Sequence, residues 1–168
     1  MYRKTTYRTI ATMFVCLFLT ATLVACTNAA TDKSSTVAPS SVASKDGGDI
    51  VIKKDEITDQ ATFIPYESGK VKMEIIAVRA PDDTIRTALN TCQVCFDSGR
   101  GYYKQVGDRL VCQNCGNQFK ISQVEKQKNG CNPVPILSED KKDDGTTITI
   151  SADFLAKNKE LFANWKTN

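Results

Sequence analysis

Cysteines are the residues of this sequence whose type and spacing are best suited to chemistry. Five of the seven lie between positions 92 and 131. Four of them form two Cys-x-x-Cys pairs, Cys92/Cys95 and Cys112/Cys115, which are separated by 16 residues, and Cys131 follows. Two residues between thiolates let both sulfurs turn toward one ion, and two such pairs supply four tetrahedral ligands. The spacing therefore predicts a metal site.

Two other uses of the paired cysteines stay open. Exported proteins meet oxidising surroundings, in which cysteines form structural disulfides. Neighbouring thiols can also act as a dithiol that exchanges disulfides. An odd number of cysteines is less natural for disulfides, and a doubled pair matches a metal site better than a single redox motif. We expect a metal first, disulfides second and a catalytic dithiol third.

The fifth cysteine, Cys131, exceeds what a tetrahedral site needs. It can replace one of the four ligands, attach a second metal or pair transiently with a ligand cysteine. Pro133 restricts the backbone nearby, which is consistent with a positioned loop. A buried free cysteine that packs as a small apolar residue explains Cys131 equally well.

Composition excludes several classes of function. The sequence has no histidine, so it cannot build a His-based general acid, a catalytic triad or a Cys-x-x-Cys-His haem site. We therefore expect no enzyme of ordinary hydrolytic type. Without Arg3, Lys4 and Arg8, 19 basic residues balance 19 acidic ones. Because binding to a phosphate backbone needs a basic surface, nucleic acid is not an expected partner.

The N-terminus has the pattern of an export signal. A basic segment precedes an apolar run over residues 10–25, which ends in Leu23-Val24-Ala25-Cys26. The run is shorter than the roughly 20 apolar residues of a membrane span, so an uncleaved anchor is the weaker alternative. The ending resembles the lipobox of bacterial lipoproteins, whose cysteine is lipidated. We predict a signal peptide over 1–25 and an extracytoplasmic protein held at the membrane by lipid on Cys26.

Residues 26–49 are expected to be a flexible linker, because they are small and polar almost throughout. Residues 50–168 are long enough for one hydrophobic core and should form a cysteine-rich metal-binding domain. The predicted fold class is α+β, a small β-rich domain with two Cys-x-x-Cys knuckles and a C-terminal helix.

The elements that must position the cysteines are mostly strands. Apolar and β-branched segments bounded by turn residues predict strands at Ala61–Tyr66, Val71–Arg79, Thr84–Ala88, Tyr102–Val106, Arg109–Cys112, Val134–Leu137 and Thr146–Ile150. The last two are expected to pair around a charged loop, and Gly107-Asp108 is typical of a tight hairpin turn.

The C-terminal helix should begin after Ser151, a good N-cap, with Asp153 in its first turn. Its apolar face is expected to pack on the core. The members of that face are Phe154, Leu155, Leu161, Phe162 and Trp165.

The cysteine motifs and their neighbours resemble the FtrD-like membrane iron–sulfur domain family. The similarity spans roughly Ala61 to Phe162, and its distinctive part is the order of two Cys-x-x-Cys pairs followed by Cys-Asn-Pro-x-Pro. The segments that carry it are Ile85–Cys95, Gly101-Tyr102-Tyr103, Val111–Phe119 and Gly130–Pro135.

This resemblance implies a membrane-associated iron–sulfur protein that transfers electrons or handles iron beside an iron-uptake system. Cys92, Cys95, Cys112 and Cys115 would be its ligands, with Cys131 as a fifth. Clusters are normally assembled in the cytoplasm, whereas zinc, mononuclear iron or Cu(I) could bind after export. We expect an iron–sulfur cluster or mononuclear iron, with zinc as the alternative. The alternative function is a zinc- or disulfide-stapled module that docks on a membrane transporter.

Overall fold

The structure, a computed structural model, describes residues 47–128 and 130–167. The predicted signal peptide, Cys26 and most of the predicted linker lie outside these residues. Within the described part of the chain, no helix is long and apolar enough to cross a membrane.

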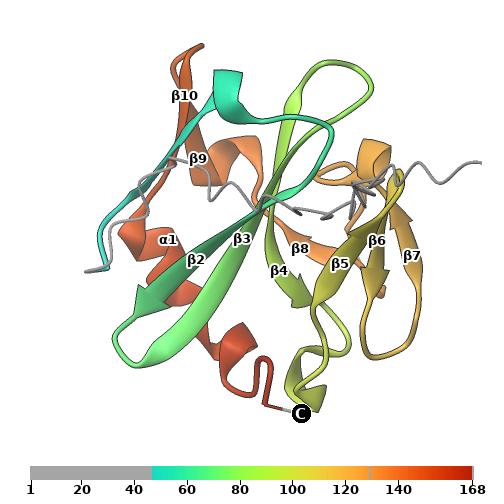
Figure 1. The fold of residues 1–168 in the computed structure, drawn as a ribbon. Helices are drawn as coiled ribbons and strands as arrows, with labels where there is room; N and C mark the ends of the chain where they lie inside the picture. Colours follow the sequence, from blue (N-terminus) through green and yellow to red (C-terminus); the bar gives the residue numbers. More distant parts are fainter. Residues whose placement is uncertain (1–46, 129, 168) are drawn as a thin grey trace, which may run out of the picture. The chain divides into compact units, whose positions relative to one another are not determined.

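Three antiparallel sheets form the described domain (Figure 1). The central sheet has the order β2 (Thr62–Ser68), β3 (Val71–Arg79), β4 (Ile85–Cys92) and β8 (Pro133–Pro135). A second sheet has the order β1 (Ile50–Lys53), β10 (Thr147–Ile150) and β9 (Lys141–Asp143). The third sheet has the order β5 (Tyr103–Val106), β6 (Arg109–Cys112) and β7 (Gln118–Lys120).

The helical elements are short. The α-helix α1 covers Ala152–Lys157. Five short 3₁₀ segments lie at Lys54–Glu56, Phe96–Ser98, Ile121–Gln123, Ser138–Asp140 and Lys159–Phe162.

The central sheet is covered on both faces, and strand β3 shows this directly. Its sequence is VKMEIIAVR, with an almost continuous apolar run in its second half. Because successive side chains of a strand point to opposite faces, Ile75 enters one hydrophobic core and Ile76 enters another. On β4, Leu89 and Ala88 divide between the same two cores. A strand buried on both faces needs such a run rather than strict alternation.

The first core lies between the central sheet, the β1–β10–β9 sheet and the C-terminal helix. The N-cap Ser151 accepts a hydrogen bond from the Phe154 N–H at 3.2 Å. Helix α1 ends at Lys157, before the last residues of the predicted apolar face. A 3₁₀ turn at Lys159–Phe162 follows it. Leu155 and Phe162 are buried in this core, and the other members of the predicted face are partly buried against it. The predicted packing of this face is confirmed.

Most predicted strands agree with the structure within two residues at either end, although β4 runs on to Cys92. The predicted pairing of Val134–Leu137 with Thr146–Ile150 is wrong. Instead, β8 pairs with β4, and β10 pairs with β1 and β9. The charged segment between the two predicted strands forms β9 instead of a simple loop, which gives β10 its own partner. The prediction of a small β-rich domain with one C-terminal helix is confirmed.

Candidate metal centre

Each Cys-x-x-Cys pair begins at the last residue of a strand. Cys92 ends β4 and Cys112 ends β6, so the first cysteine of each pair is held by a ladder of backbone hydrogen bonds. Both are buried, with exposed fractions of 0% and 1%. Cys95 then lies half-buried before the 3₁₀ turn at Phe96–Ser98, and Cys115 lies exposed between β6 and β7.

The second pair forms a tight turn. The Gly116 N–H donates to the Cys112 carbonyl at 2.9 Å, and the Cys112 N–H donates to the Asn117 carbonyl at 2.9 Å. Gly116 has a φ of 73°, a conformation that glycine adopts without steric cost. The glycine that follows the second pair therefore has the role that its place in the motif suggests.

The first pair depends on a close approach of another segment. The Cys92 N–H donates to the Gly101 carbonyl at 2.7 Å. A side chain at Gly101 would place its Cβ only 2.2 Å from the Cys95 carbonyl oxygen. Glycine at this position is therefore a steric requirement of the pair. From the sequence alone, Gly101 stands out only as part of the family resemblance.

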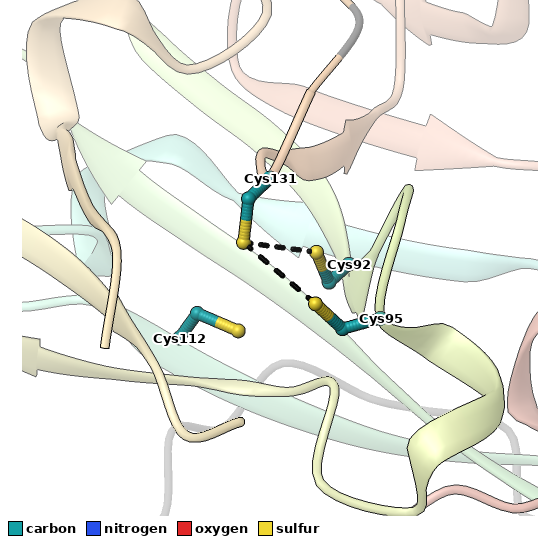
Figure 2. A group of neighbouring side chains, drawn as sticks. All are labelled: Cys92, Cys95, Cys112 and Cys131. Atoms are coloured by element: carbon teal, nitrogen blue, oxygen red, sulfur yellow. Dashed lines mark hydrogen bonds between the residues drawn. The ribbon is translucent and has the colours of Figure 1, made fainter. Parts of the chain in front are cut away.

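The structure brings the sulfurs of Cys92, Cys95 and Cys112 together with that of Cys131 (Figure 2). The sulfurs of Cys92, Cys95, Cys112 and Cys131 all lie within 4.8 Å of one another. Cys131 is central to this group, since its Sγ lies 3.3 Å from that of Cys92 and 4.0 Å from that of Cys95. The Cys115 Sγ lies 2.9 Å from the Cys131 Sγ. All five cysteines of the described domain are free thiols.

The compact group differs from the ligand set that the family resemblance implies. Position in the motifs favours Cys115 as the fourth ligand, whereas the mutual distances place Cys131 in that position. Cys115 joins the group from the exposed side through Cys131. The long loop between β7 and β8, which carries Cys131 to the other cysteines, leaves no signal in the motif spacing.

Thiolate donors suit iron, iron–sulfur clusters, zinc and Cu(I). A tetrahedral ion with metal–sulfur bonds of about 2.3 Å holds its sulfurs about 3.8 Å apart. The ligands of a cluster are shared among at least two irons, and those on different irons must stand further apart, because irons and sulfides occupy the space between them. The donor types therefore fit the group that the resemblance implies, and the separations within 4.8 Å fit a single ion.

Two of the thiols have a pKa below that of an ordinary cysteine. Burial acts to raise the pKa of Cys92, but hydrogen bonds from Tyr103 and from the backbone N–H groups of Val94 and Cys95 lower it overall. A hydrogen bond from Cys131 lowers the pKa of Cys115. Thiolate is the form that binds metal, so a lowered pKa at these two sites favours binding of a cation.

The other three thiols hold their protons more strongly. Burial raises the pKa of Cys95 to about 11. Burial likewise raises the pKa of Cys112 and that of Cys131, and hydrogen bonding with Cys115, Cys92 and Cys112 raises the pKa of Cys131 further. Metal binding must therefore displace protons from these three thiols.

Two polar residues that the sequence analysis did not single out support the thiol group. Tyr103 is 1% exposed, and its Oη lies 3.9 Å from the Cys131 Sγ. The buried Asn90 accepts a hydrogen bond from the Tyr103 N–H at 2.7 Å. Its backbone carbonyl accepts another from the Trp165 Nε1–H at 2.7 Å, which connects the thiol region to the C-terminal segment. Tyr103 stood in a predicted strand, but nothing in its surroundings marked its hydroxyl as a partner of sulfur.

Residues 57–162 match the family described as membrane iron-sulfur containing protein FtrD-like. The match covers more than half of the chain and contains all five cysteines of the domain. The resemblance predicted from the motifs is therefore confirmed, and it indicates an iron-related metal protein. No curated protein matches the chain.

Proposed function

We propose, on the premise that this chain belongs to the FtrD-like family of membrane iron–sulfur proteins, that it is a membrane-anchored extracytoplasmic iron protein. Its role would be electron transfer or iron handling beside a membrane iron-uptake system. The observation that supports this proposal most directly is the group of four cysteine sulfurs within 4.8 Å of one another. The proposed role is binding and transfer, not catalysis.

The proposed ligands are Cys92, Cys95, Cys112 and Cys131, with Cys115 at the rim. Bound iron would supply one-electron redox chemistry. The protein's contribution would be to hold the thiolates from two strand ends and to bury part of the site. Buried sulfurs and nearby hydrogen-bond donors tune the reduction potential of such centres. Tyr103 is placed to be one of these donors.

The decisive measurement is the metal content of protein matured through its own export route. We expect stoichiometric iron and visible charge-transfer absorption that bleaches when a reductant is added. Labile sulfide would identify a cluster, and its absence beside iron would identify a mononuclear site. Colourless protein with stoichiometric zinc and no iron would contradict an iron role.

Anchoring through Cys26 is a separate part of the proposal. Mass spectrometry of the mature protein should find lipid on Cys26 as the first residue, and Cys26→Ser should release the protein from the membrane fraction. A matched control is Cys16→Ser, which changes a cysteine within the predicted signal peptide. Membrane association that survives Cys26→Ser would show that another contact holds the protein there.

A second function is favoured by one observation. A closed set of four thiolates with separations suited to a single ion is typical of structural zinc sites. In that case zinc would staple a domain that docks on a membrane transporter. Replacing bound iron with zinc distinguishes the two functions, since a structural module keeps its activity in the cell with either ion and a redox protein does not.

A further inference from the structure

Five thiols compete for the four positions of a tetrahedral ion. The sulfurs of Cys92, Cys95, Cys112 and Cys131 form the compact group. The Cys115 sulfur lies 2.9 Å from that of Cys131, closer than the sulfurs of Cys92 and Cys95 lie to it. A tetrahedral ion cannot take all five. One thiol is therefore left over whenever the site is filled.

The five cysteines differ in how deeply they lie. Cys92 and Cys112 are buried at the ends of β4 and β6. Cys95 and Cys131 are half-buried, and Cys115 is exposed. An ion that arrives from solvent or from another protein's thiolates meets Cys115 first, whereas the closed site is completed by Cys131.

We propose that Cys115 and Cys131 are alternative ligands for the fourth position. Cys115 binds the ion at the surface during loading and release, and Cys131 replaces it in the closed site. Cys115 is thus the residue through which a thiophilic metal ion enters and leaves. This inference rests on the proposed metal-binding function, but it applies to any thiophilic divalent ion and does not require iron.

The exchange is a ligand substitution without a change of oxidation state. The bond from the ion to the Cys115 sulfur breaks as a bond to the Cys131 sulfur forms. The proton of the Cys131 thiol ends on the Cys115 sulfur, and the separation of 2.9 Å lets it pass directly between the two atoms. Charge is conserved, because one thiolate and one thiol are present before and after the step.

The two segments that carry the exchanging cysteines are joined. Asn117 lies two residues after Cys115, and its Nδ2–H donates to the backbone carbonyl of Cys131 at 2.9 Å. Gly130, directly before Cys131, has a φ of 92°, and a side chain there would meet open space. The hydrogen bond from Asn117 thus holds Cys131 beside Cys115, while the backbone at Gly130 has open space around it. This arrangement suits a ligand that moves a short distance without disturbing the strand-end cysteines.

The first test is thiol protection in the mature full chain. The protein is loaded with one equivalent of Zn(II), treated with iodoacetamide and mapped by mass spectrometry. We expect alkylation of Cys115 and protection of the four cysteines in the compact group. Protection of Cys115 with alkylation of Cys131, or protection of all five, would overturn the exchange. Alkylation of all five would instead contradict the metal-binding function itself.

The second test compares Cys115→Ser with Cys131→Ser, using Co(II) as a coloured probe and a chelator to remove it. Cys115→Ser should keep the four-thiolate charge-transfer intensity, while loading and removal slow by roughly tenfold or more. Cys131→Ser should bind Co(II) through Cys115 and release it roughly tenfold faster than the unaltered protein. Val106→Ser is the matched control, since Val106 is an exposed residue at the end of β5, outside the thiol group. Unchanged exchange rates in Cys115→Ser would overturn the inference.

These outcomes are separable from those of the proposed function. Both tests use zinc or cobalt, so they succeed or fail whatever ion the protein carries in the cell. If Cys131→Ser does not fold, the loading and removal rates of Cys115→Ser still decide the question.

Discussion

The two cores on opposite faces of β3 and β4 are built from different chemistry. The first, between the central sheet and the β1–β10–β9 sheet, is filled by apolar side chains, mostly isoleucine. The second, between the central sheet and the β5–β6–β7 sheet, includes Cys92, Cys112 and Tyr103, with two further cysteines packed against it. Neighbouring residues of one strand thus pack in different cores, one apolar and one that contains thiols.

This difference separates stability from function within a small domain. Burial of apolar surface stabilises the first core without any ligand. In the second core, sulfurs and a tyrosine hydroxyl take space that apolar atoms would fill, and a bound ion contributes stability only to the form that binds it. We therefore expect the first core to be indifferent to metal and the second to depend on it.

The largest effect should come from the apolar core. Ile75 is fully buried there, and Ile75→Ala should lower the free energy of unfolding by about 2–5 kcal/mol. Because no thiol packs in this core, the loss should be equal with and without metal. Urea denaturation of both forms measures it, and Val51→Ala, on the exposed face of β1, is the control. A loss that differs by more than about 1 kcal/mol between the two forms would show that the cores are coupled.

The next effect should come from the close approach at the first cysteine pair. Gly101→Ala brings a Cβ against the Cys95 carbonyl, so the pair must shift. We expect roughly 1–3 kcal/mol of destabilisation, as for other overpacked sites, and weaker metal binding. Gly69→Ala is the control, because Gly69 lies in the β2–β3 turn with open space around it and a φ of 65°. It should lose stability through backbone strain and keep its metal affinity. Equal metal affinity in the two variants would contradict a steric role for Gly101.

The same contrast explains which features the sequence could predict. Apolar and β-branched segments bounded by turn residues located β3 and β6 to the residue, because local chemistry specifies these elements. The short strands β7 and β9 were not predicted, since QFK and KKD carry no apolar alternation of useful length. Their place in the sheets depends on partners that lie elsewhere in the chain.

The site shows the same limit. Two Cys-x-x-Cys pairs predict a thiolate cluster because the chemistry lies within each motif. The sequence allowed Cys131 to replace one of the four ligands but did not identify which one, since that depends on how a loop returns to β4 through β8. The hydroxyl of Tyr103 was missed for the same reason, as its partner sulfur lies 28 residues away.

A smaller effect should come from the hydroxyl beside the sulfurs. Tyr103→Phe removes a donor to the thiol group and keeps the ring that packs in the second core. Loss of such a supporting hydrogen bond should weaken metal binding by roughly tenfold, and a redox-active ion should also change its reduction potential. Chelator competition and electrochemistry measure the two quantities. The control is Tyr102→Phe, which keeps a ring that packs edge-on against Trp165, with 6.3 Å between the ring centroids. An unchanged affinity and potential in Tyr103→Phe would leave the tyrosine with a packing role alone.

The smallest effect should come from the N-cap of helix α1, which packs on the first core. Ser151→Ala removes the side-chain oxygen that accepts the Phe154 N–H, and loss of an N-cap costs about 1 kcal/mol. Ser151→Asp keeps an acceptor at the cap and is the matched control. Helix α1 packs in the first core through Leu155, so stability should fall while the metal affinity stays constant. If chelator competition instead showed weaker metal binding in Ser151→Ala, the effect would have to pass through the C-terminal segment, where Trp165 donates to Asn90 beside Tyr103. That outcome would join the two cores through one hydrogen-bonded route, and restoration of metal affinity in Ser151→Asp would establish it.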